Sequence, residues 1–175
     1  MTDVRHLLAP LAIESVHEQH RVNPKAFTYS MGTNRMQWVH APGKLPVTCD
    51  CSSYVTMIYY MAGAPDPNGL NFDGQGYTGT LLSNKANRHI NKADVLPGDL
   101  VVYGGGTGEH VAIITEVMPN GDLVSISMGQ NGDPSYVWVN APKGDRKAMA
   151  IDGRTPQTFL RCLTDRLRPP VAFHY

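Results

Sequence analysis

Apolar residues recur at helical spacing near the start of the chain and again after position 50. The first repeat predicts a helix within residues 3–21, which Pro10 either kinks or begins. Its apolar positions are Val4, Leu7, Leu8, Leu11, Ala12 and Val16. The second repeat predicts a helix over 51–62, with Asp50 as N-cap and Gly63 as the stop. Its apolar positions are Tyr54, Val55, Ile58, Met61 and Ala62.

Two shorter patterns also read as helical. Residues 78–87 predict a short helix around Leu81 and Leu82. Near the end of the chain, Thr155 and Pro156 resemble a helix cap and its first residue, so a C-terminal helix is predicted there. Its apolar face is formed by Phe159, Leu160, Leu163 and Leu167.

The middle of the chain changes to strand patterns. Residues 100–103 and 110–117 are apolar runs joined by the glycine-rich segment 104–108, which predicts an antiparallel hairpin. The turn signal at 119–122 separates a further strand over 123–127, and another strand is predicted over 136–139. Helices followed by an antiparallel meander indicate the α+β class. We expect a single domain over residues 1–175.

Composition narrows the classes of function. The 175 residues include 15 Lys and Arg and 15 Asp and Glu, so there is no basic excess to indicate nucleic-acid binding. No apolar run approaches the roughly 18 residues of a transmembrane helix. The N-terminal residues lack a secretory signal pattern, so we expect synthesis in the cytoplasm. We also expect a monomer, with no metal and no cofactor.

Cys51 and His110 form the candidate chemistry. Cys51 stands in the first turn of the predicted helix over 51–62, and His110 follows 59 residues later at the head of a predicted strand. A helix N-terminus is expected to lower the thiol pKa, and its free amides could bind an oxyanion. An imidazole within reach could hold the thiol proton. The alternative is that Cys51 is only a small buried residue; Cys49 and Cys162 are interpreted as a bystander and a core residue.

These two residues lie in motifs that resemble a known family. The segment Asp50-Cys51-Ser52-Ser53-Tyr54-Val55 resembles the Asp-Cys-Ser-Gly-aromatic-Val box of NlpC/P60 cysteine peptidases, with Ser53 in the place of the usual Gly. Residues 96–101, Leu-Pro-Gly-Asp-Leu-Val, and 109–113, Glu-His-Val-Ala-Ile, resemble that family's His box. The resemblance covers about residues 26–135 and implies a papain-like core, with the nucleophile at a helix N-terminus packed on an antiparallel sheet.

The wider context resembles the peptidase domains of actinobacteriophage endolysins. The segments that carry this resemblance are 29–36, 62–69 and 76–82. An endolysin is made in the host cytoplasm without a signal peptide and acts on the cell wall after release, so the resemblance implies the same for this chain.

The resemblance implies catalytic roles for Cys51 and His110, but the third group departs from the family. Met128 occupies the place of the usual His, and Met cannot orient an imidazole. Gln130 is our prediction for this role, because an amide can accept from the ring N–H. Asn131 and Ser127 are the alternatives, and a Cys–His dyad without a third group is a further one.

The remaining site predictions concern substrate and base. Tyr29, Ser52 and Asn131 are predicted to contact substrate, although Tyr29 could equally be a core residue. If His110 were not the base, His89 would be the next candidate. His17 and His20 lie three apart, but no Asp, Glu or Cys partner has metal spacing near them.

The resemblance implies that the substrate is a stem peptide of peptidoglycan, cut at the bond between D-glutamate and diaminopimelate or at an equivalent bond. The nearest alternative is a CHAP-like N-acetylmuramoyl-L-alanine amidase, and acyl transfer of the transglutaminase type would use the same chemistry. A non-catalytic wall-binding or virion structural protein of the same fold is the alternative outside enzymes.

Overall fold

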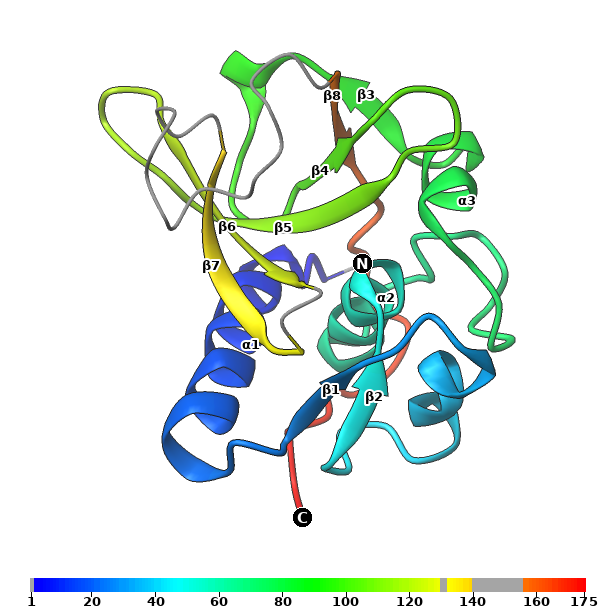
Figure 1. Ribbon diagram of the computed structural model, residues 1–175. Helices are drawn as coiled ribbons and strands as arrows, with labels where there is room; N and C mark the ends of the chain where they lie inside the picture. The colour runs from blue at the N-terminus through cyan, green and yellow to red at the C-terminus, as the bar shows by residue number, and fades with distance from the viewer. Residues whose placement is uncertain (1, 130–131, 140–155) are drawn as a thin grey trace.

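The computed structural model describes residues 2–129, 132–139 and 156–175. A six-stranded sheet forms one layer, and two helices, α1 and α2, pack against it (Figure 1). The helical elements are α1 (Arg5–His17), η1 (Glu18–Val22), η2 (Thr33–His40), α2 (Cys51–Ala62), α3 (Thr78–Ser83) and η3 (Lys92–Asp94). The strands are β1 (Phe27–Tyr29), β2 (Val47–Cys49), β3 (Arg88–Ile90), β4 (Leu100–Tyr103), β5 (His110–Val117), β6 (Leu123–Met128), β7 (Pro134–Val139) and β8 (Gln157–Arg161).

The large sheet is antiparallel throughout and has the strand order β3-β8-β4-β5-β6-β7. The central strands β4 and β6 are buried on both faces, because the alternating side chains of the sheet enter two separate clusters. Val111 and Ile113 point to the helices, whereas Ala112 and Ile114 join the smaller cluster on the opposite face. The predicted α+β class and the hairpin formed by β4 and β5 are confirmed.

Helix α2 has the bounds that the sequence predicts. The Asp50 carboxylate accepts a hydrogen bond from the Ser53 amide at 2.7 Å, and Gly63 ends the helix in the left-handed conformation with a φ of 81°. Apart from Tyr60, every residue of α2 is buried. The helix is therefore held on all sides and presents a fixed N-terminus towards β5.

The predicted C-terminal helix is wrong. Residues 157–161 form β8, which lies between β3 and β4 in the sheet. Phe159 and Leu160 enter the clusters on opposite faces, as neighbours in a strand do, whereas Leu163 and Leu167 are exposed. The apolar residues of this segment have a spacing that also fits a helix, but hydrogen bonding to β3 and β4 makes the segment a strand. Elsewhere α1 contains Pro10 inside its span, and the helix predicted over 78–87 is limited to α3.

No helix among the described residues is long and apolar enough to cross a membrane.

A buried carboxylate joins the N-terminal helix to the sheet. Asp99, which is fully buried, accepts from Arg5 at 2.6 Å and from Arg161 at 2.7 Å. It also accepts from the Leu96 amide at 2.8 Å, which fixes the turn before β4. This single side chain therefore connects α1, β4 and β8.

We expect Asp99→Ala to lower the free energy of unfolding by about 3 kcal/mol, because two arginines lose the partner of a buried ion pair. Chemical denaturation followed by circular dichroism measures the change. Glu116→Ala removes an exposed carboxylate from β5 and is the control, with an expected change within about 0.5 kcal/mol. Equal stability of the two variants would show that the Asp99 pairs contribute nothing.

Candidate active site

Cys51 occupies the first position of α2, where the chain enters from β2. Its side chain is 7% exposed. Three backbone amides, those of Cys51 itself, of Ser52 and of Val111 in β5, lie close enough to the thiol to lower its pKa. The sulfur therefore lies between the open end of a helix and the beginning of a strand, with amide hydrogens converging on it.

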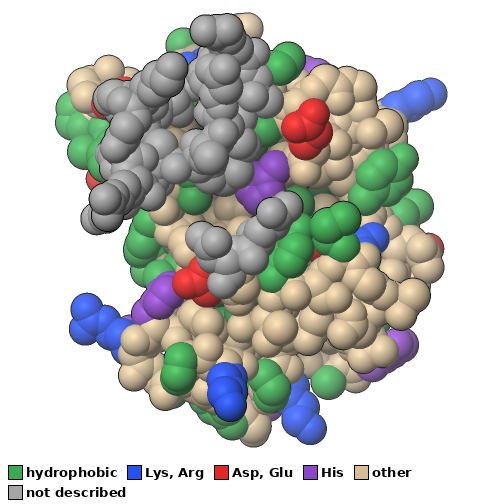
Figure 2. All heavy atoms as spheres, viewed as in Figure 1, with side chains coloured by type: hydrophobic (Ala, Val, Ile, Leu, Met, Phe, Trp, Pro, Cys, Tyr) green, Lys and Arg blue, Asp and Glu red, His purple; other side chains and the backbone are tan. Residues whose placement is uncertain are grey.

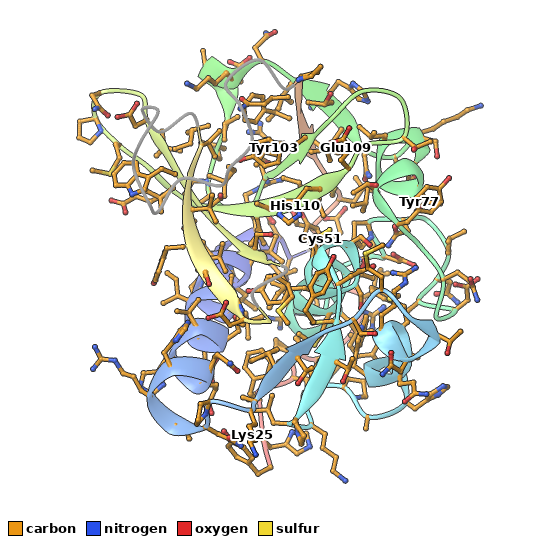
Figure 3. The ribbon with its side chains drawn as sticks, viewed as in Figure 1. Lys25, Cys51, Tyr77, Tyr103, Glu109 and His110 are labelled. Atoms are coloured by element: carbon orange, nitrogen blue, oxygen red, sulfur yellow. The ribbon has the colours of Figure 1, made fainter. Side chains whose placement is uncertain are left out.

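His110 is the first residue of β5 and directly precedes the strand residue that contacts the thiol. Its ring is partly exposed, and Figure 3 shows it beside Cys51 on the same face of the molecule. A histidine side chain is visible at the centre of this face in the space-filling view (Figure 2). The predicted pair Cys51 and His110 is thus brought together by the packing of α2 against β5.

Ser127 contacts the imidazole of His110 at its Nε2 atom. Its hydroxyl lies 2.5 Å from His110 Nε2, on the strand next to β5. The contact leaves Nδ1 as the ring nitrogen that is free to meet a thiol. The sequence places Ser127 behind Gln130, because Val124, Ile126 and Met128 share an apolar face that is expected to meet His110. In the structure the opposite face of β6, which carries Ser127, meets the ring, and Met128 packs in the core.

Burial dominates the electrostatics of the pair. It raises the pKa of the Cys51 thiol to about 11, helped by the nearby Asp50 carboxylate and opposed by the three amides. Burial also lowers the pKa of His110 to about 4, which the charge of Asp50 partly offsets. Our expectation of a lowered thiol pKa is therefore wrong, because loss of water outweighs the helix N-terminus here. At neutral pH the resting pair is an uncharged thiol and an uncharged imidazole.

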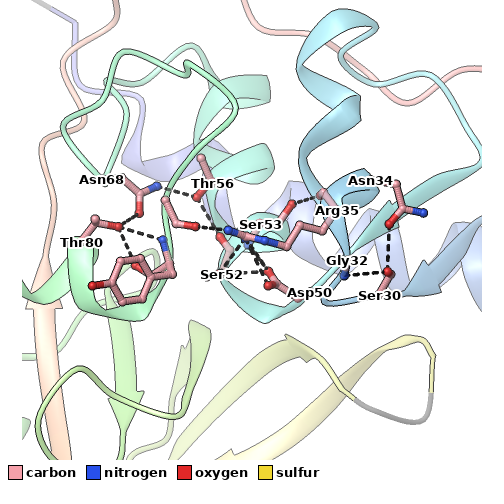
Figure 4. A network of polar contacts seen from close by, with 12 residues as sticks. Ser30, Gly32, Asn34, Arg35, Asp50, Ser52, Ser53, Thr56, Asn68 and Thr80 are labelled. Atoms are coloured by element: carbon pink, nitrogen blue, oxygen red, sulfur yellow. Dashed lines mark hydrogen bonds and ion pairs between the residues drawn. The ribbon is translucent and has the colours of Figure 1, made fainter.

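A polar network fixes the N-terminus of α2 (Figure 4). Arg35 of η2 pairs with the Asp50 carboxylate at 3.2 Å and donates to the Gly76 carbonyl at 2.5 Å. The Ser53 hydroxyl donates to the Arg35 carbonyl and accepts from the Trp38 indole at 2.8 Å. Ser53, which replaces the family's usual Gly, thus ties η2 to α2, a contact that glycine could not make.

The predicted substrate contacts fall in different environments. Tyr29, at the end of β1, is half-buried and lies close enough to Cys51 and Asp50 for their charges to raise its pKa, although burial is the larger cause. Ser52 is 3% exposed and its hydroxyl donates to Asp50 at 3.0 Å. Tyr29 therefore adjoins the thiol, whereas the Ser52 hydroxyl belongs to the network below it.

Gln130 and Asn131 lie outside the described residues, so their predicted roles stay predictions. Met128 is fully buried and packs in the core cluster that includes the helices, on the face of β6 opposite to Ser127. His89 is exposed on β3, which β8 and β4 separate from β5. Within the described ranges, no group of three or more His, Cys, Asp or Glu side chains is arranged to hold a metal ion.

We expect Cys51 to be protonated at pH 7, since its pKa lies near 11. Ultraviolet absorbance of the thiolate should be absent at neutral pH and should grow as the pH approaches 11, with Cys51→Ser giving the background of Cys49 and Cys162. A thiolate signal at pH 7 that disappears in Cys51→Ser would instead demonstrate a preformed thiolate–imidazolium pair.

Comparison with known proteins finds one matching family and similar solved structures. The model of the NlpC/P60 family matches residues 27–141. Among solved structures, the peptidoglycan hydrolase RipB from Mycobacterium tuberculosis is 22% identical, with a TM-score of 0.49 over 91% of this chain. The P60 domain of antigen MAP1204 from M. avium subspecies paratuberculosis is 19% identical, with a TM-score of 0.43 over 92% of this chain and 98% of its own.

The chain spans 66% of the length of the RipB chain. No curated protein matches it. The family match covers more than half of the sequence and includes Cys51, His110 and Ser127. The chain therefore belongs to the NlpC/P60 family of cysteine peptidases.

Proposed function

We propose that the protein is a peptidoglycan hydrolase that cleaves an amide bond of the stem peptides, between D-glutamate and diaminopimelate or an equivalent residue. The observation that carries the proposal is the convergence on one point of the Cys51 thiol, the amides around it and the His110 ring. Membership of the NlpC/P60 family and the description of RipB as a peptidoglycan hydrolase support the substrate class.

Because Cys51 and His110 are both uncharged at rest, the first step must combine proton transfer with attack on the substrate. His110 Nδ1 accepts the thiol proton as the Cys51 sulfur attacks the carbonyl carbon, so charge develops only as the bond forms. The carbonyl oxygen becomes an oxyanion, for which the first-turn amides of α2 are the available donors. Collapse of this tetrahedral intermediate breaks the C–N bond, and the imidazolium returns its proton to the leaving amine.

The second half of the reaction uses the same groups in reverse. A water molecule gives one proton to the neutral His110 ring and attacks the thioester carbon. The resulting oxyanion collapses, the C–S bond breaks, and the sulfur recovers its proton from the imidazolium. The products are a peptide with a new carboxylate, a peptide with a new amine and the unchanged enzyme.

The new ends of the released peptides identify which bond the protein cuts. Digestion of purified peptidoglycan, followed by mass spectrometry of the fragments, should release a peptide that begins with diaminopimelate. Release of intact stem peptides from muramic acid would indicate the N-acetylmuramoyl-L-alanine amidase instead. New cross-links would indicate acyl transfer, and an unchanged wall that retains the protein would indicate a non-catalytic wall-binding protein.

An endolysin role belongs to the same proposal. It rests on the sequence segments that resemble actinobacteriophage endolysins, and it places synthesis in the host cytoplasm and action on the wall after release.

Replacement of the nucleophile should end hydrolysis. Cys51→Ala and Cys51→Ser should abolish peptide release from peptidoglycan, because neither side chain supplies a thiol. Cys49→Ala is the matched control: this cysteine is two residues away but fully buried in the core, so activity should remain near that of the wild type. Peptide release by Cys51→Ala would refute the thiol mechanism.

His110→Ala should lower turnover by at least ~10²-fold, the usual scale for a general acid–base group. In the wild type, activity should fall as the pH drops through about 4, because the protonated ring can no longer accept the thiol proton. His89→Ala, which changes an exposed histidine on a strand that two others separate from β5, should leave the rate unchanged. A large loss in His89→Ala with activity retained in His110→Ala would move the base.

A further inference from the structure

Ser127 carries a buried hydroxyl that contacts the His110 ring. Its side chain is 2% exposed and makes two contacts: one to His110 Nε2 at 2.5 Å, and one to the Val111 carbonyl oxygen at 3.0 Å. Val111 therefore serves both partners of the proposed pair. Its carbonyl receives the Ser127 hydroxyl, while its amide lies close to the Cys51 thiol.

The number of hydrogens available for these two contacts decides which nitrogen of the His110 ring carries a hydrogen. A serine hydroxyl has one hydrogen to donate, and a carbonyl oxygen can only accept. The Ser127 hydrogen is therefore used on Val111, and towards His110 the hydroxyl oxygen acts as acceptor. The Nε2 atom must then carry the ring hydrogen, which leaves a lone pair on Nδ1 in the neutral imidazole.

The strand geometry explains why a serine can reach the ring. Pairing between β5 and β6 ends at Ile113 and Ile126, although both strands continue towards the site. Beyond that point a side chain from β6 contacts the backbone of β5 at Val111. Period-two alternation gives this place to Ser127 and directs Met128 into the core.

We infer that Ser127 is the positioning residue of the catalytic histidine: it accepts the Nε2 hydrogen and so keeps Nδ1 free to take the proton of Cys51. The inference rests on the proposed function for its kinetic part, whereas the state of the ring stands independently of any substrate. The role that an amide or a second imidazole performs in related mechanisms is here given to a hydroxyl, which is held in place by a backbone carbonyl.

Nuclear magnetic resonance of the full chain labelled with ¹⁵N-histidine tests the state of the ring directly, with His110→Gln identifying its signals. At neutral pH the hydrogen should be bonded to Nε2 and protected from exchange with water. Ser127→Ala should lose that protection, and Ser127→Thr, which keeps the hydroxyl, should retain it. A His110 ring with its hydrogen on Nδ1 would overturn the inference whatever the activity of the protein.

Kinetics on peptidoglycan provide the second readout. Ser127→Ala should lower kcat by about 10-fold or more with KM little changed, a loss smaller than that of His110→Ala because the base itself remains. Ser127→Thr should recover much of it. The matched control is Ser125→Ala, which removes from the same face of β6 a buried hydroxyl that contacts the Val137 carbonyl and Tyr103 rather than His110.

The outcomes separate the two proposals. Equal losses of kcat in Ser125→Ala and Ser127→Ala would show that Ser127 has only a structural role. A loss in Gln130→Ala with none in Ser127→Ala would return the role to Gln130. Activity in Cys51→Ala would refute the proposed function while leaving the ring measurement valid.

Discussion

The packing of the α2 N-terminus against the start of β5 is the contact on which the whole site depends. It brings the amide of Val111 onto the Cys51 sulfur and so places His110, the preceding residue, beside the nucleophile. Nearly all of α2 is buried, so the helix has no room to turn or slide relative to the strand. The apolar core thereby determines the position of polar groups that have few contacts of their own.

The same burial sets the charge state of the pair. Removal of water disfavours the thiolate and the imidazolium together, and three amides and one carboxylate do not reverse that balance. A pair that is uncharged at rest spends no free energy on holding separated charges in a dry site. In the mechanism that we propose, charge develops only as the thiol attacks a substrate carbonyl, so proton transfer and attack form a single coupled event.

Around Cys51 and His110, the sequence departs from the family pattern at two positions, and a serine makes a contact near each one. Ser53 stands where the family usually has glycine, and its hydroxyl joins η2 to the helix that carries Cys51. Met128, which the motif resemblance aligns with the family's usual histidine, packs in the core, and the neighbouring hydroxyl of Ser127 contacts the His110 ring from the opposite face of the strand. Both departures keep the geometry of Cys51 and His110 by means of a serine.

Local sequence was sufficient for the elements whose signals are local. The N-cap at Asp50, the stop at Gly63 and the glycine-rich connection after β4 fix α2 and the central hairpin through backbone chemistry that neighbouring residues decide alone. For the same reason the motifs around Cys51 and His110 were sufficient to identify the family and the candidate pair. The sequence by itself thus determined the chemistry that the chain carries.

Tertiary structure decided whatever depends on partners distant in the chain. The apolar residues in 157–161 have a spacing that also fits a helix. These residues form a strand because they pair with β3 and β4, which are distant in the sequence. Burial of Cys51 by segments far away reversed the direction of its expected pKa shift. The contact of Ser127 depends on which face of β6 meets His110. Ser125 and Ser127 alternate with apolar residues, but both faces of this strand are buried, so the alternation alone does not show which face meets the ring.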